Sequence, residues 1–167
     1  RKAGKLRGVG ISNTIERAAG PSLESMEIRF DPSGSVTLNA GTTQQGQGHE
    51  TIYKQIMCDQ LGLDPDDIRV VEGDTDTLAF GGGTGGSRSA TIGGSTVLLA
   101  SKKIAEKGKK IAAALLEAAE ADIEFTDGQY VVAGTDRTIS LKDVAIAAYK
   151  PGKLGPDIEP GFIANQV

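Results

Sequence analysis

The chain has 167 residues and a mass of 17.3 kDa, which is the size of one domain, and it is 38% hydrophobic and 24% charged. This balance supplies a hydrophobic core and excludes a disordered chain. A formal net charge of −4 gives no support for a nucleic-acid-binding surface, and no apolar run reaches the length of a membrane span. No signal-peptide pattern is found, so we expect a soluble, cytoplasmic protein.

The first half of the chain predicts strands, a helix and a further strand. Strand patterns occupy Gly8–Glu16, Met26–Phe30 and Ser35–Ala40, the last two joined by a turn at 31–34. From Gly48 to Leu61 the apolar residues share one helical face, and Gly62 is suited to end that helix. Ile68–Val71 predicts a short buried strand.

The second half begins with residues 73–86, which are too rich in glycine for regular structure. A long helix is expected from Ser87–Thr91 to about Ala119, with a break at the pair Gly93-Gly94. A hairpin (Ile123–Thr126 and Gln129–Ala133) and a helix capped by Ser140 and reaching Tyr149 follow.

The order of these elements predicts an α+β fold. We expect a mixed sheet, made of a strand meander and a later strand, packed by a medium and a long helix, with a C-terminal hairpin and short helix. Residues 1–150 would form the domain, and residues 151–167, rich in proline and glycine, an extended arm.

The first segment that could carry chemistry is Gly41–Thr51, GTTQQGQGHET, between a strand and a helix. Backbone N–H groups at a helix start can bind phosphate, and glycines let a ligand approach the backbone. The side chains of Gln45 and Gln47 both donate and accept hydrogen bonds, which suits the mixed edge of a heterocycle. A plain polar loop explains this segment equally well.

The second segment is Gly81–Thr91, GGGTGGSRSAT, which also leads into a helix. Gly81 and Gly86 have the spacing of a P-loop, but Ser87 and Arg88 stand where that motif needs Lys and then Ser or Thr. We therefore exclude a P-loop NTPase. A flexible loop remains the simple alternative for this segment.

Three residue types need separate interpretations. Arg88 would either contact a phosphate or pair with Asp74 or Asp76 in the neighbouring turn. His49 lacks a matched nucleophile or acid, so a helix-capping or ligand-contacting role is favoured over general base catalysis. Cys58 and His49 are the only cysteine and histidine, so we expect no disulfide within the chain, no metal held by side chains and no catalytic residue.

Taken in order, residues 45–51, 73–77 and 81–91 resemble the molybdenum hydroxylases, a family that includes xanthine dehydrogenase, aldehyde oxidase and the large subunit of aerobic carbon monoxide dehydrogenase. The resemblance covers most of the chain and is nearest to the carbon monoxide dehydrogenase group. It implies a domain that binds molybdopterin, in bacteria usually as molybdopterin cytosine dinucleotide, whose dithiolene holds the molybdenum. It also implies a two-electron oxidation with a water-derived oxygen.

The resemblance assigns cofactor-binding residues in both glycine-rich segments. On the pterin side they would be Gln45, Gly46 and Gln47, with Gly48 and His49 beside them. On the pyrophosphate and nucleotide side they would be Gly86, Ser87, Arg88, Ser89 and Thr91, with Gly85 beside them.

The chain also departs from that family's pattern. It is several times shorter than the family's large subunit, and it lacks counterparts of the upstream cysteine loop and of the downstream glutamate. The resemblance therefore implies one cofactor-binding piece, inactive alone, whose partners are the remainder of the molybdenum subunit and iron–sulfur and FAD subunits or domains. The substrate stays open among carbon monoxide, an aldehyde, a purine and another N-heterocycle.

Two other functions remain open: a non-catalytic scaffold or inter-subunit interaction module, and a generic phosphate or nucleotide binder. Because half of the site would lie elsewhere, we expect the isolated chain to bind cofactor too weakly to survive purification. Its glycine-rich loops would then be mobile.

Overall fold

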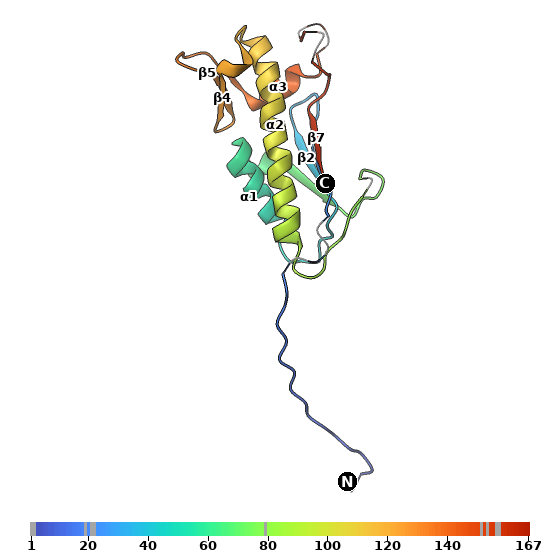
Figure 1. The fold of residues 1–167 in the computed structure, drawn as a ribbon. Coiled ribbons are helices and arrows are strands. Elements are labelled where there is room, and N and C mark those ends of the chain that lie inside the picture. Colours follow the sequence, from blue (N-terminus) through green and yellow to red (C-terminus); the bar gives the residue numbers. More distant parts are fainter. Residues whose placement is uncertain are drawn as a thin grey trace.

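The computed structural model describes residues 3–18, 20, 23–78, 80–150, 152, 154–155 and 158–167. Its main layer is a four-stranded sheet in the order β3-β2-β1-β7 (Figure 1). The strands are β1 (Met26–Phe30), β2 (Val36–Ala40), β3 (Ile68–Glu72) and β7 (Ile163–Gln166). β1 is antiparallel to β2 and β7, whereas β2 is parallel to β3, so the sheet is mixed, as predicted.

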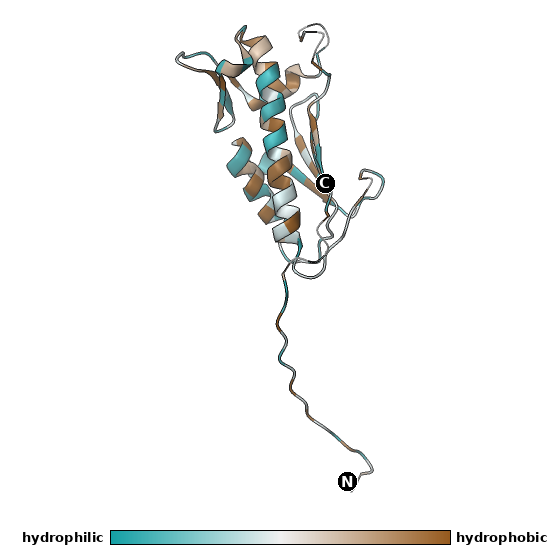
Figure 2. Ribbon diagram, viewed as in Figure 1, coloured by the Kyte–Doolittle hydropathy of each residue, from teal (hydrophilic) through white to brown (hydrophobic). Residues whose placement is uncertain are grey.

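Two helices cover one face of this sheet (Figure 1). α1 (His49–Leu61) is the crossover that the parallel pairing of β2 and β3 requires, and it packs on β3 and on α2 (Gly94–Leu115). α2 also packs on β1 and β7. The buried residues of both helices are largely apolar, and the ribbons of α1 and α2 carry brown, apolar stretches in Figure 2. Gly62 ends α1 in the left-handed conformation, as expected.

A second, smaller sheet lies beside the C-terminal half of α2. It has the order β4-β5-β6, with β4 (Ile123–Thr126), β5 (Gln129–Val132) and β6 (Thr138–Ser140). Gly108 lets this sheet approach α2, because a Cβ there would lie 1.7 Å from the Tyr130 hydroxyl oxygen. Ser140 caps α3 (Leu141–Ala147) by accepting from the Asp143 N–H at 3.0 Å, which confirms the predicted cap. Single 3₁₀ turns, η1 (Pro65–Asp67) and η3 (Glu120–Asp122), precede β3 and β4.

The α+β class, the strands at 26–30, 35–40 and 68–71, the medium and the long helix and the hairpin are confirmed. The predicted strand Gly8–Glu16 is wrong for this structure, because those residues form no helix or strand and remain exposed. The break expected at Gly93-Gly94 is absent: a π-helical turn, η2 (Ser89–Gly93), runs directly into α2, which ends at Leu115.

Two strands were not predicted. β6 continues the hairpin into a three-stranded sheet, and β7 turns the end of the expected arm into an edge strand of the main sheet. Cys58 is half-buried and packs against the core, as expected, and burial raises the pKa of its thiol. Among the described helices, none is both long and apolar enough to cross a bilayer.

Candidate cofactor site

Two loops meet at one edge of the main sheet because their strands are parallel neighbours. Residues 41–48 follow β2, residues 73–88 follow β3, and Ala40 stands opposite Glu72 at the ends of these strands. The carboxyl ends of adjacent parallel strands share an edge, where ligands of α/β sheets commonly bind. The topology therefore brings together the two segments that the sequence analysis singled out.

Backbone and hydroxyl hydrogen bonds join the two loops. The Gly83 N–H donates to the Gly41 carbonyl at 3.0 Å, and the Thr43 N–H donates to the Thr84 hydroxyl at 3.1 Å. The Thr84 hydroxyl donates in turn to the Thr43 carbonyl at 2.8 Å. A Cβ at Gly41 would lie 2.8 Å from the Gly81 Cα, so glycine at these positions permits the close approach of two backbones.

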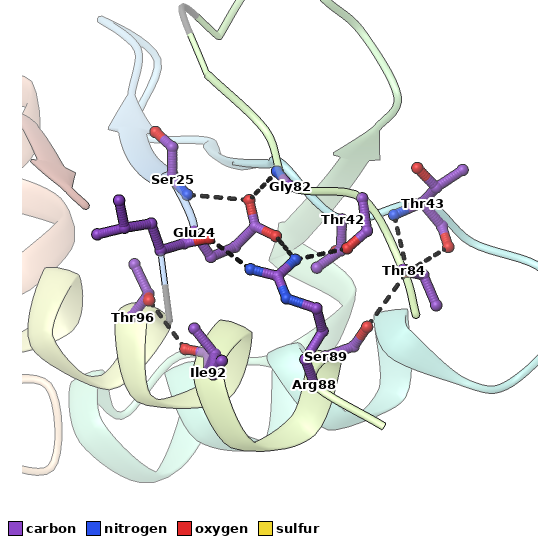
Figure 3. Close-up of polar contacts among 12 residues, drawn as sticks. Glu24, Ser25, Thr42, Thr43, Gly82, Thr84, Arg88, Ser89, Ile92 and Thr96 are labelled. Carbon is purple, nitrogen blue, oxygen red and sulfur yellow. Dashed lines mark hydrogen bonds and ion pairs between the residues drawn. The ribbon is translucent and has the colours of Figure 1, made fainter. Parts of the chain in front are cut away.

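A buried ion pair holds the second loop against the start of β1 (Figure 3). Arg88 Nη1 lies 2.6 Å from Glu24 Oε2, and the two side chains are 6% and 0% exposed. The other oxygen of Glu24 accepts from the N–H groups of Ser25 and Gly82, at 3.0 and 2.9 Å. Arg88 also donates to the carbonyls of Gly83 and Leu23, so the charged groups are well solvated by the protein.

This arrangement corrects the expected partner of Arg88. The guanidinium pairs with Glu24, 64 residues away, rather than with Asp74 or Asp76. The Asp74 carboxylate instead accepts from the Asp76 N–H at 2.9 Å within its own turn. Local spacing could not have predicted the pair with Glu24, because only the folded sheet brings β1 beside the second loop.

A second buried network links the loops to α1. His49 Nδ1 lies 2.9 Å from Glu72 Oε1, and Thr42 donates to the same oxygen. The hydroxyls of Thr42 and Tyr53 are 3.0 Å apart, and Tyr53 donates to the Ser89 carbonyl at 3.3 Å. Burial raises the pKa of Tyr53 to about 12, so it stays a neutral donor.

The His49 side chain is only 3% exposed, and it lines the pocket described below. A neutral imidazole that donates from Nδ1 to a carboxylate presents Nε2 as an acceptor. The sequence analysis did not identify Glu72 as the residue that orients His49.

His49 opens onto a pocket of about 460 Å³ between the two loops. Seven of the predicted residues line it: Gln45, Gln47, His49, Gly85, Ser87, Arg88 and Ser89. Ile52, Thr84 and Ala90 line it as well and were not predicted. The pocket thus combines amides, hydroxyls and an imidazole with the cation already paired to Glu24.

The remaining predicted residues lie near the pocket without lining it. A Cβ at Gly46 or Gly48 would meet nothing within 4 Å, so their backbone faces open space. Gly86 lines a neighbouring hollow with Gly20, Leu23 and Phe80. The Thr91 hydroxyl donates to the Arg88 carbonyl at 3.2 Å inside η2.

The backbone from Gly86 to Gly93 is unusual. Gly86 and Ser87 have positive φ values of 58° and 52°, and Arg88 follows in the right-handed helical region. Alternation of this kind forms concave nests of N–H groups that bind anions. The Gly93 N–H then reaches the Arg88 carbonyl at 3.4 Å, five residues back, which is the π-helical bond of η2.

The family model of the molybdopterin cofactor-binding domain matches residues 1–165. This chain belongs to that family. The molybdopterin cofactor-binding domain described here is 41% identical to part of the carbon monoxide dehydrogenase large chain of Afipia carboxidovorans, over 96% of this chain and 21% of that protein. It is 38% identical to part of the nicotine 6-hydroxylase large subunit of Paenarthrobacter nicotinovorans, over 97% of this chain and 22% of the relative.

Solved structures show the same fold. A Cu,Mo carbon monoxide dehydrogenase matches 90% of the domain with a TM-score of 0.82 and 40% identity, over 20% of its own chain. Quinoline 2-oxidoreductase from Pseudomonas putida 86 matches 85% with a TM-score of 0.75 and 35% identity, over 18% of its own chain. The domain therefore spans about a fifth of the length of these relatives.

The residues of the pocket fit a molybdopterin. The amide of Gln45 can match the donor and acceptor groups of a pterin edge, whereas that of Gln47 already accepts from the Gln45 N–H at 2.6 Å and donates to the Thr43 carbonyl at 3.3 Å. A Cβ at Gly85 would meet nothing within 4 Å, so the loop backbone is open to a ligand there. Because Arg88 is committed to Glu24 and the Ser87 hydroxyl donates to Glu16, the backbone N–H groups of the nest at residues 86–88 are the better candidates for binding a diphosphate.

Proposed function

We propose that this chain is the cofactor-holding portion of a carbon monoxide dehydrogenase-like large subunit and that it binds molybdopterin as its cytosine dinucleotide. The observation that carries the proposal is the pocket between the two loops, which draws its lining from both predicted segments. Membership of the molybdopterin cofactor-binding family supports it. When bound, the cofactor would supply the molybdenum centre for a two-electron oxidation.

The side chains divide into contacting and positioning groups. Gln45 and Gln47 would hold the pterin, and His49 Nε2 would accept a hydrogen bond from one of its N–H groups. The backbone at Gly46 and Gly48 would lie on the same pterin side. The backbone at residues 85–87, with Ser89 and Thr91 beside it, would serve the diphosphate and nucleotide end. Arg88 would keep the loop in place through Glu24.

Activity would require chain outside these 167 residues. This chain covers 21% of the carbon monoxide dehydrogenase relative, so that protein extends well beyond the matched part. We therefore propose that the isolated chain is inactive and that iron–sulfur and FAD partners accept the electrons in a cytoplasmic assembly.

Substrate choice would also be made elsewhere. Relatives named for carbon monoxide, nicotine and quinoline match this domain at 41%, 38% and 35% identity. Similar sequence identity to relatives with such different substrates is expected if the domain binds a cofactor that all of them share.

The test is the molybdenum and CMP content of the purified large subunit that contains this chain, expressed in a host that makes the cofactor. We expect equimolar amounts of both in the subunit and loss of both from the isolated chain during purification. The double variant Gln45→Ala, Gln47→Ala should lose both while its thermal unfolding midpoint is unchanged. Gln44→Ala, an exposed neighbour outside the pocket, is the matched control.

Other outcomes would identify the alternatives. A double variant that keeps its molybdenum but fails to assemble with partner subunits would indicate a scaffold. Binding of ATP or CTP by the isolated chain, measured by calorimetry, would indicate a generic nucleotide binder. Full molybdenum and CMP content in the isolated chain would overturn the proposal that half of the site lies elsewhere.

A further inference from the structure

The N-terminal residues 3–18 extend away from the body of the molecule as a single irregular segment (Figure 1). Its large aliphatic side chains are almost fully exposed: Leu6 85%, Val9 98%, Ile11 97% and Ile15 93%. Brown, apolar stretches occur along this extended trace in Figure 2. Contiguous exposed aliphatic groups of this kind mark an interaction site.

The sequence of this segment has the pattern of a half-buried strand. Val9, Ile11 and Ile15 fall on one face of an extended chain, whereas Ser12 and Thr14 fall on the other. A single strand has no ladder partner and buries no side chain, so it gains nothing from this pattern alone. In the described part of this chain the segment pairs with neither of the two sheets, so the pattern has no partner strand there.

The segment is nevertheless part of the family domain. The molybdopterin cofactor-binding family model begins at residue 1 and so includes it. The carbon monoxide dehydrogenase relative aligns with this chain over only 21% of its length, so most of its polypeptide lies outside the match. That polypeptide is the natural source of a partner strand.

The inner end of the segment contacts the candidate cofactor site. The Ser87 hydroxyl donates to Glu16 Oε1 at 3.0 Å, and Ser87 lines the pocket. A strand that docks through residues 8–16 would therefore place whatever it joins beside the second glycine-rich loop. Pairing there would complete the wall of an otherwise open pocket.

We propose that residues 8–16 are a β-strand that this chain donates to a sheet edge in the remainder of the large subunit, with Val9, Ile11 and Ile15 facing its core. The proposal rests on the proposed function only in taking the chain as part of a larger subunit. Backbone pairing of this kind is strand addition, in which the ladder gives affinity and the alternate side chains give specificity.

Hydrogen exchange measured by mass spectrometry tests the proposal on the 167-residue chain and on the whole subunit. We expect the amides of residues 8–16 to exchange at the rate of an open chain in the first and on the order of 10²-fold more slowly in the second. Equal exchange in both samples, fast or slow, would overturn it. The molybdenum content of the same subunit reports separately on the proposed function.

Variants on the two faces of the segment identify the polypeptide that pairs with residues 8–16. In the whole subunit, Ile11→Lys should abolish protection of residues 8–16, whereas Ser12→Lys, on the opposite face, should preserve it. Protection that survives Ile11→Lys would contradict the assigned face. Light scattering of the isolated chain completes the test: a monomer is expected, and a dimer broken by Ile11→Lys would show that a second copy is the partner.

Discussion

The pair Glu24–Arg88 places full charges in the interior, with both side chains almost completely buried. A buried ion pair contributes little to stability compared with a well-packed apolar pair, but removal of one partner leaves the other charge buried without it. Contacts among the described residues show how the fold accommodates these charges: two backbone N–H groups donate to Glu24, and Arg88 donates to two backbone carbonyls. The second glycine-rich loop thus depends on a residue that precedes β1.

We predict that Glu24→Ala lowers the free energy of unfolding by about 3–5 kcal/mol, because the buried Arg88 would lose the counter-charge that Glu24 supplies. Urea denaturation followed by circular dichroism measures the change. Glu50→Ala is the matched control: Glu50 pairs with Lys54 on the surface of α1 with 58% of its side chain exposed, so its loss should cost less than about 1 kcal/mol. Equal effects of the two variants would contradict the structural importance of the buried pair.

We predict that the ring of His49 carries its proton on Nδ1, because Glu72 accepts a hydrogen bond there. The chain has one histidine, so ¹⁵N NMR of the labelled protein gives a single imidazole pattern. On the neutral ring, at the alkaline end of a pH series, the Nδ1–H tautomer should predominate in the wild type, and Glu72→Ala should move the ring toward Nε2–H. A wild-type ring protonated on Nε2 would mean that Nε2 cannot accept from a ligand.

The sequence indicated which residues form the site, but it did not indicate which residues contact and position them. Gln45, Gln47 and Ser87 come together in one pocket, as the order of motifs indicated. Glu24 and Glu72 were missed as positioning residues because each acts on a residue that is distant in sequence, Arg88 and His49 respectively. Only the pairing of β2 with β3 and the approach of β1 place these side chains together.

At the scale of elements, the glycines of the two loops serve two purposes that their sequence does not distinguish. Gly41, Gly81 and Gly82 allow close contact: a Cβ at Gly82 would lie 2.5 Å from Arg88 Nη1. Gly46, Gly48 and Gly85 instead border open space. The first group builds the site, and the second leaves room in it.

We predict opposite consequences for an alanine in each group. Gly41→Ala should destabilise the fold by about 1–3 kcal/mol, because its Cβ would be forced against Gly81 and Glu24. Gly85→Ala should change the free energy of unfolding by less than about 0.5 kcal/mol, because its φ is ordinary and the space is open.

Thermal unfolding and molybdenum content of the two variants, made in the whole subunit, separate these effects. Gly85→Ala should lose cofactor at an unchanged unfolding midpoint, since its methyl group enters the space left for the ligand. Retention of cofactor by Gly85→Ala would mean that this part of the loop does not contact it.

The elements that the sequence failed to predict share a physical cause. β6 has only three residues, too few to show alternation, and β7 follows a stretch rich in proline and glycine. The segment 8–16 shows the opposite case, a clear strand pattern without a sheet. Local patterns describe what a segment can do, whereas pairing decides whether it does so.

At the scale of the whole molecule, two buried tyrosines make the stability of the folded state depend on pH. Tyr53 contacts the loop network and Tyr130 packs against α2, and burial raises the pKa of both phenols, that of Tyr53 to about 12. A raised pKa in the folded state contributes stability that is fully present below the unfolded value near 10 and is lost as the pH rises through the folded value.

We therefore predict that the denaturation midpoint is insensitive to these phenols below pH 10 and falls between pH 10 and about 12. Urea midpoints across that range measure the effect, and Tyr53→Phe should make the fall shallower. A wild-type midpoint that stays constant to pH 12 would show that the phenols ionise without cost.

The π-helical turn η2 has a consequence for the path of the second loop. A turn closed by a bond to the fifth residue back contains one residue more than an α-helical turn, so η2 accommodates an extra residue where the second loop enters α2. Deleting Ala90 would remove that extra residue and allow an ordinary α-helical turn to form. The number of residues between Arg88 and Gly94, as much as their identity, therefore sets the local backbone path by which the second loop joins α2.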